Sequence, residues 1–133
     1  MPNLEDLLSC QFADGGRGPD RWDCYGLCIE VFKRYGKNIP EDYFAPALNS
    51  LAVYRQFKKV VGDWELLTEP QTPCLVAFSV LSKRRMVNHV GVYIGGGKFI
   101  HSCQGLNVTV SALSHINWRN SVIGYYKYKE AGK

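Results

Sequence analysis

The sequence lacks the features that mark membrane, repeat and disordered proteins. Its 133 residues contain no apolar stretch long enough to cross a membrane, no internal repeat and no low-complexity tract. The opening segment, MPNLEDLL, is acidic and has no basic region, unlike a secretory signal. With 46% hydrophobic residues, the chain is able to bury one core. We therefore expect a single domain over residues 1–133, synthesised in the cytoplasm without a signal peptide and with no membrane span.

Motifs for nucleic-acid binding are also missing. The net charge is +4, with basic clusters at Lys58-Lys59 and at residues 83–85. No RNP-like aromatic motif, zinc-finger spacing or P-loop accompanies this charge, so we expect no nucleic-acid partner. A cationic face would also assist the approach to an anionic polymer through long-range attraction.

The five cysteines do not show the pattern of a disulfide-bonded protein. An odd number without an export signal argues against a set of disulfides. A zinc site is chemically possible, because Cys24 and Cys28 are one helical turn apart and Cys103 is close to His101 in sequence. No paired, short-spaced cysteine motif supports it, and we expect no metal and no cofactor.

One cysteine stands at the predicted start of a helix. Asp23-Cys24-Tyr25-Gly26 opens a run with apolar residues at helical spacing, and Gly36 suits the position just past the helix end. Unpaired N–H groups and the positive end of the helix dipole favour an anion in the first turn, and a nearby imidazolium does the same. We therefore expect the thiolate form of Cys24 to be favoured. A free cysteine is more commonly a small buried hydrophobe, and this interpretation fits the other four: Cys10, Cys28, Cys74 and Cys103.

Two histidines flank a predicted hairpin. Residues 87–94 form an apolar segment rich in β-branched and aromatic residues that contains His89, and residues 98–103 resume after three glycines with His101. Antiparallel pairing about Gly96 places position 89 near position 103, and a shift of about two residues brings His101 beside His89 on one face. A cysteine, a base and an orienting group together predict thiol hydrolysis.

The motifs Asp23-Cys24-Tyr25-Gly26, residues 89–95 (HVGVYIG) and residues 99–102 (FIHS), in this order and spacing, resemble the NlpC/P60 cysteine peptidases. Residues 15–27 (GGRGPDRWDCYGL) more narrowly resemble the phage tail-assembly branch of that family. The resemblance extends from Gly15 to about Tyr128.

This resemblance implies an α+β, papain-like fold in which the nucleophile helix packs on an antiparallel β-sheet. It implies cleavage of peptide bonds in peptidoglycan stem peptides, between D-glutamate and a diamino acid, with Cys24 as nucleophile, His89 as general base and then acid, and His101 as the orienting group. Phage tail proteins are further expected partners. The site of action would be a virion tail, or the periplasm or cell wall after delivery.

The sequence departs from the family pattern at two points. Many members have a tyrosine about a dozen residues before the nucleophile, where Phe12 stands here with Gln11 beside it, and the Gly-Asp that usually precedes the central strand is absent. We expect Gln11, Phe12, Asp23 and Tyr25 to contact substrate, with the oxyanion held by Gln11 or by backbone N–H groups. A catalytically silent domain of the same fold, which holds a peptide or a tail protein without cleaving it, is the alternative.

The remaining elements follow from local pattern. We expect a short helix capped by Asn3, loops over residues 15–23 and 38–46, and a second helix over residues 47–61 packed by one apolar face. Strands are predicted at residues 75–81, 87–94, 98–103, 108–110 and 121–128. Residues 111–118 suit a short helix or turn, with His115 as a surface or packing residue.

Overall fold

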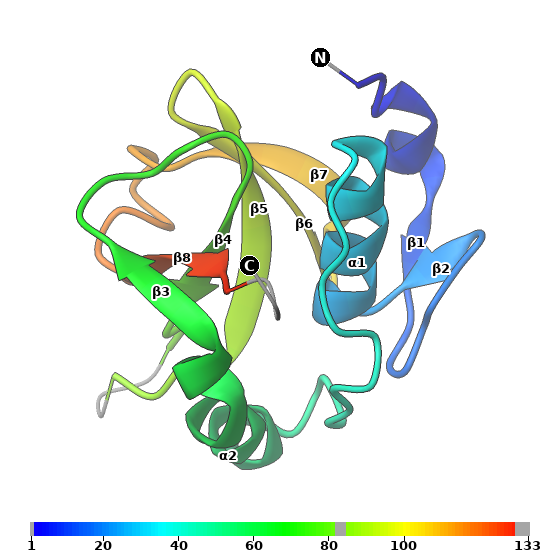
Figure 1. Ribbon diagram of the computed structural model, residues 1–133. Coiled ribbons are helices and arrows are strands. Elements are labelled where there is room, and N and C mark those ends of the chain that lie inside the picture. The colour runs from blue at the N-terminus through cyan, green and yellow to red at the C-terminus, as the bar shows by residue number, and fades with distance from the viewer. Residues whose placement is uncertain (1, 82–84, 130–133) are drawn as a thin grey trace.

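A six-stranded antiparallel sheet forms the centre of the computed structural model, which describes residues 2–81 and 85–129. Its strand order is β3-β8-β4-β5-β6-β7 (Figure 1). The strands are β3 (Trp64–Leu67), β4 (Cys74–Phe78), β5 (His89–Gly95), β6 (Lys98–Cys103), β7 (Asn107–Ala112) and β8 (Val122–Tyr128). A separate two-stranded parallel pair joins β1 (Gln11–Phe12) to β2 (Arg21–Trp22).

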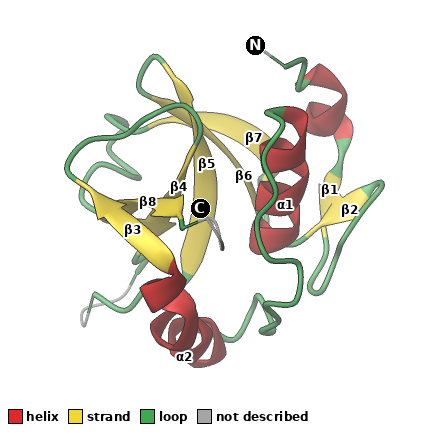
Figure 2. Cartoon of the chain, viewed as in Figure 1, coloured by secondary structure: helices red, strands yellow, loops and turns green. Residues whose placement is uncertain are grey.

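Two α-helices accompany the sheet (Figure 2). Helix α1 (Cys24–Arg34) lies against β5 and β6 and next to β2. Helix α2 (Ser50–Val60) lies at the end of the molecule where α1 begins, and two short 3-10 helices, η1 (Glu5–Ser9) and η2 (Val61–Asp63), complete the set. The helix predicted to open at Cys24 is confirmed, and Gly36 follows it with a φ of 78°. The α+β fold class expected from the sequence is therefore correct.

The sheet buries both faces because its central strands alternate between two apolar clusters. Leu75 and Ala77 of β4 pack with α1, whereas Val76 and Phe78 point to a second cluster that contains Phe99 and Trp118. A strand buried on both faces is a continuous apolar run rather than an alternating one. This explains the sequence CLVAF of β4, which is buried throughout.

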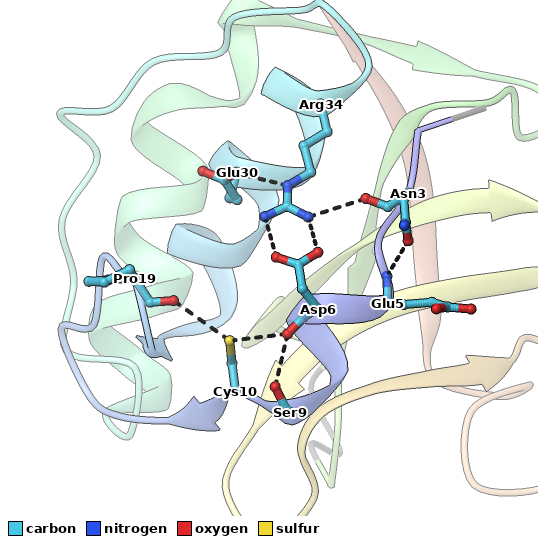
Figure 3. Close-up of polar contacts among 8 residues, drawn as sticks. All are labelled: Asn3, Glu5, Asp6, Ser9, Cys10, Pro19, Glu30 and Arg34. Atoms are coloured by element: carbon cyan, nitrogen blue, oxygen red, sulfur yellow. Dashed lines mark hydrogen bonds and ion pairs between the residues drawn. The ribbon is translucent and has the colours of Figure 1, made fainter.

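The N-terminal segment is fastened to α1 by a cluster of polar contacts (Figure 3). The guanidinium of Arg34 in α1 forms an ion pair with Asp6 of η1, donates to Asp6 Oδ2 at 2.9 Å and also pairs with Glu30 one turn earlier. Asn3 Oδ1 accepts from the N–H of Glu5 at 2.9 Å, but the N-cap is Leu4 and has no side-chain cap bond, so the predicted Asn3 cap is wrong. The element itself is a 3-10 turn.

Three local expectations differ from the structure. Strand β3 was not predicted, and it exists through its antiparallel pairing with β8. Helix α2 begins at Ser50, and Leu48 and Leu51 are exposed, so the predicted apolar face is wrong at these two positions. The contact of α2 with the core is made by Phe57, whose ring meets Tyr126 edge-on at 5.6 Å.

None of the helices in the described ranges is long and apolar enough to span a membrane. Of the basic cluster at residues 83–85, residues 83 and 84 lie outside the described part of the chain.

Candidate active site

Cys24 is the first residue of α1, and the turn that presents it depends on its neighbours. Asp23 is the N-cap, and its carboxylate accepts from the N–H of Gly26 at 2.6 Å. A Cβ at position 26 would lie 2.4 Å from the carbonyl oxygen of Gly16 and 2.9 Å from Asp23 Oδ1. Only glycine fits there, which explains the spacing of the Asp-Cys-x-Gly motif.

Two further hydrogen bonds fix this turn against the rest of the protein. The N–H of Asp23 donates to the carbonyl oxygen of Gly16 at 2.9 Å. The Ser102 hydroxyl donates to the carbonyl oxygen of Trp22 at 2.7 Å and is fully buried. Ser102 follows His101 directly in β6, so this bond connects the turn that presents Cys24 to the strand that carries His101.

The Cys24 thiol is neutral in the free protein. Burial and the nearby Asp23 carboxylate raise its pKa to about 12, and hydrogen bonds with the N–H groups of Val90, Tyr25 and Cys24 itself only partly oppose this. The expectation that the helix start favours the thiolate is therefore wrong for the free protein, because the loss of hydration outweighs the helix dipole. The Val90 N–H places the sulfur at the beginning of β5, one residue from His89.

His89 and His101 form a hydrogen-bonded relay. The ring atoms His89 Nε2 and His101 Nδ1 are 2.8 Å apart, and His101 Nε2 is 2.9 Å from Ser111 Oγ in β7. The observed register pairs Val92 with Ile100. Continued along both strands, it sets His89 opposite Cys103, so the two histidines are diagonal neighbours on one face and the predicted two-residue shift does not occur.

Aromatic side chains enclose both imidazoles. The ring of Trp118 stacks on His89 at 6.0 Å and meets His101 edge-on at 4.8 Å, and Phe78 and Phe99 cover the other sides. This burial lowers the pKa of His89 to about 4 and, with the neighbouring His89, lowers that of His101 to about 3. Both rings are neutral at pH 7.

The proton positions decide which nitrogen is basic. If His101 Nε2–H donates to Ser111, then His101 Nδ1 accepts from His89 Nε2–H, and the lone pair of His89 remains on Nδ1. That tautomer provides a free base, whereas the reversed chain would place a proton on His89 Nδ1. Among the described residues, the thiol of Cys24 and the ring of His89 are not hydrogen-bonded to each other. Catalytic hydrogen bonds of free enzymes are commonly loose and tighten with substrate.

An apolar cleft opens beside Cys24, between the start of α1, the start of β5 and helix α2. It contains Asp23 and Tyr25, two of the predicted substrate contacts. Gln11 and Phe12 lie in β1, and the Phe12 N–H donates to Asn107 Oδ1 at 3.0 Å. The cleft is lined by Arg17, Asp23, Cys24, Tyr25, Tyr43, Ala45, Ala47, Val53, Gln56, Phe57, Val60, Val61, Trp64, Leu75, Val87, Val90 and Tyr126.

Arg17 holds the loop that borders this cleft. Its guanidinium donates to the carbonyl oxygens of Glu41 at 3.1 Å and Tyr43 at 2.7 Å, and it lies 4.5 Å from the ring centroid of Phe44. The remaining Nε–H is buried without a hydrogen-bond partner, and Asp23 Oδ1 is 3.8 Å away.

Two residues of the site were not expected from the sequence. Ser111 was assigned to a short helix or turn, but β7 extends to Ala112 and the Ser111 hydroxyl is hydrogen-bonded to His101. Trp118 was given no role, although its ring is the shared neighbour of both imidazoles. The alternation of Val108, Val110 and Ala112 with polar residues was the available signal for the longer strand.

The cysteine at the start of α1, the antiparallel sheet on which this helix packs and the two hydrogen-bonded histidines in adjacent strands belong to a papain-like α+β fold. A model of the NlpC/P60 family matches residues 10–127, and the chain belongs to this family.

The similar curated proteins are named as endopeptidases and hydrolases. The chain is 32% identical over 123 residues to "Probable endopeptidase YafL" of Escherichia coli, covering 91% of this chain and 45% of that protein. It is 30% identical over 96 residues to gamma-D-glutamyl-L-lysine dipeptidyl-peptidase of Bacillus subtilis, covering 72% and 28% of the two. The chain thus spans less than half the length of these relatives.

Solved structures show the same fold. An NLP/P60-family protein from Staphylococcus aureus aligns over 96% of this chain and 39% of its own, with a TM-score of 0.66 and 21% identity. The NlpC/p60 domain of peptidoglycan hydrolase SagA aligns over 93% and 92%, with a TM-score of 0.61 and 19% identity.

Proposed function

We propose that this chain is a cysteine peptidase that cleaves an amide bond in peptidoglycan stem peptides. The observation that carries the proposal is that the Val90 N–H contacts the Cys24 sulfur one residue from His89, the first member of the His89–His101–Ser111 relay. Neutral thiol and neutral imidazole are the ground state, so proton transfer accompanies nucleophilic attack.

Acylation begins when a substrate carbonyl reaches Cys24. His89 Nδ1 takes the thiol proton while Sγ bonds to the carbonyl carbon, and the carbonyl oxygen becomes an oxyanion that backbone N–H groups at the helix start stabilise. His101 Nδ1 accepts from His89 Nε2–H and so stabilises the imidazolium. The C–N bond then breaks as His89 returns its proton to the leaving amine.

Deacylation uses the same groups in reverse. His89 Nδ1 removes a proton from water, the hydroxide attacks the thioester, and the C–S bond breaks. The departing sulfur recovers its proton from His89, which restores the neutral pair.

The substrate bond that we propose lies between D-glutamate and a diamino acid. The Bacillus subtilis relative is named for γ-D-glutamyl-L-lysine, and a γ-linked D-glutamate has a free α-carboxylate. Arg17 lines the cleft beside Cys24, and its positive charge suits such a carboxylate. The apolar side of the cleft suits alkyl parts of the peptide.

A phage or prophage tail is the proposed setting, with tail proteins as further partners and the cell wall as the place of action. This part of the proposal is supported by the motif at residues 15–27. Mass spectrometry of purified phage particles should detect the chain, and its consistent absence from them would contradict this setting.

The proposed activity is tested with synthetic L-Ala-γ-D-Glu-diamino acid peptides that carry either L-lysine or diaminopimelate, with products identified by mass spectrometry. Wild type should release the diamino acid, Cys24→Ala and His89→Ala should each abolish release while remaining folded, and Cys10→Ala should cleave like wild type. Full activity of Cys24→Ala would refute the mechanism.

A catalytically silent peptide-binding domain is the second candidate. Phe12 provides no hydroxyl where many family members have tyrosine, and the raised pKa of Cys24 weakens the free nucleophile. Saturable binding of the same peptides with no cleavage by wild type would favour this candidate.

A further inference from the structure

Cys103 lies beside the histidine relay but has no part in the proposed peptidase mechanism. One ring nitrogen of His89, one of His101 and the Sγ of Cys103 all lie within 4.8 Å of one another. Cys103 is the last residue of β6, two positions after His101, so both side chains lie on the same face of the strand. His101 is fully buried, whereas Cys103 is partly exposed and gives this cluster contact with solvent.

These three groups match the ligand chemistry of zinc. Zinc binds imidazole nitrogen at about 2.0–2.1 Å and thiolate sulfur at about 2.3 Å, so tetrahedral ligands are separated by about 3.3–3.6 Å. The facing nitrogens His89 Nε2 and His101 Nδ1 are 2.8 Å apart, and the full set is within 4.8 Å. Side-chain adjustments of about 1 Å would bring the three to zinc-ligand distances while leaving a fourth position open.

The surroundings orient one of the ligands. Ser111 Oγ lies 2.9 Å from His101 Nε2, so in the tautomer in which this ring donates Nε2–H to the hydroxyl, its Nδ1 lone pair points into the cluster. A histidine that binds a metal through one nitrogen commonly donates the other N–H to such a partner.

We propose that His89 Nε2, His101 Nδ1 and Cys103 Sγ form an inhibitory zinc site. Binding of Zn²⁺ releases the Cys103 thiol proton to solvent and breaks the hydrogen bond between the two imidazoles. It also moves the His89 proton from Nε2 to Nδ1, the nitrogen that serves as the base. The site therefore binds zinc or performs catalysis, but not both.

The inhibitory role rests on the proposed peptidase function, whereas zinc binding does not, so the first experiment needs no substrate. Zn²⁺ affinity is measured by competition with a chromophoric chelator for wild type, Cys103→Ala, Cys24→Ala and Cys10→Ala. Cys10 is the matched control because it is also partly exposed and lies in the N-terminal cluster, where its Sγ is 3.6 Å from the carbonyl oxygen of Pro19 (Figure 3).

The site predicts that Cys103→Ala weakens zinc binding at least tenfold, while Cys10→Ala and Cys24→Ala bind like wild type. Alkylation followed by mass spectrometry gives a second measurement, in which one equivalent of zinc protects Cys103 but not Cys10. Equal affinity of wild type and Cys103→Ala, or loss of binding in Cys24→Ala alone, would overturn the assignment.

The inhibitory role is tested on peptide cleavage. Zinc should inhibit wild type, a chelator should restore its rate, and Cys103→Ala should keep its basal activity and need at least tenfold more zinc for half-inhibition. If zinc binds at Cys103 but wild type cleaves at an unchanged rate, the inhibitory role is refuted; if wild type does not cleave even without zinc, the peptidase proposal fails and the binding result still stands.

Discussion

Removing the Ser111 hydroxyl tests whether the relay sets the base. In Ser111→Ala, His101 Nε2 loses the partner that lies 2.9 Å away in the structure. The tautomer that leaves His89 Nδ1 free then loses its support, although Ser111 itself does not touch the reacting atoms. Ser111 is therefore a positioning residue, and its loss should act on the chemical step.

The size of the effect follows from the burial of His101. A hydrogen bond contributes about 0.5–1.5 kcal/mol net, and an unsatisfied buried donor costs about 1–3 kcal/mol. His101 is fully buried, so the larger range applies. Since each 1.36 kcal/mol is a factor of ten in rate, we expect kcat to fall by about 5–150-fold with KM nearly unchanged.

The assay is peptide cleavage as a function of pH, with Ser111→Thr and Ser114→Ala as controls. Threonine keeps the hydroxyl and suits a strand, so it should restore most of the rate. Ser114 is exposed in the following turn, and its substitution should change nothing. A wild-type rate in Ser111→Ala, or an equal loss in Ser111→Thr, would refute the reasoning.

Three further predictions concern the turn and the histidines. Gly26→Ala gains about 1 kcal/mol of helix propensity but forces a Cβ to 2.4 Å from the carbonyl oxygen of Gly16. The free energy of unfolding, measured in denaturant titrations, should therefore fall by about 1–3 kcal/mol. An increase in this free energy would contradict the close approach. His101→Ala should leave a weak residual rate, because orientation is lost but the base remains, and an unchanged rate would remove His101 from the site. Burial lowers the pKa of His89 from 6.5 to about 4, so the unfolded chain binds more protons between these values. The His89 contribution to stability should be full above pH 6.5 and fall by about 3 kcal/mol as the pH falls to 4. His89→Gln should make the slope shallower by this amount while the contribution of His101 remains; an equally steep slope in that variant would contradict the cause.

Local pattern was sufficient for the elements whose residues determine their own structure. The nucleophile helix follows from its apolar spacing, the Asp23 cap and Gly36, all of which act within a few residues. Strand β3 was missed because Trp64–Leu67 is an edge strand of four residues, and only its pairing with distant β8 makes it a strand. Edge pairing of this kind depends on the tertiary fold.

The residues of the candidate site also divide into those that local sequence pattern predicts and those that depend on the tertiary fold. Cys24, His89 and His101 are identifiable from motif and spacing, whereas Ser111 depends on the register between β6 and β7, which sets Thr109 opposite His101 and Ser111 two pairs further along, opposite Phe99. Whether the pKa of Cys24 is raised or lowered in the folded protein also could not be derived from the sequence. A helix start lowers the pKa of a thiol, and burial raises it, so the outcome depends on packing around the sulfur.

The central claim is that Cys24 forms a covalent acyl intermediate. The most direct test is rapid acid quenching of wild type with the stem peptide, followed by proteolysis and mass spectrometry of all five cysteines. The account predicts an acyl adduct on Cys24 that turns over, no such adduct in Cys24→Ala, and a much slower appearance in His89→Ala. Peptide cleavage that proceeds without any adduct on Cys24, or an adduct on another cysteine, would contradict it.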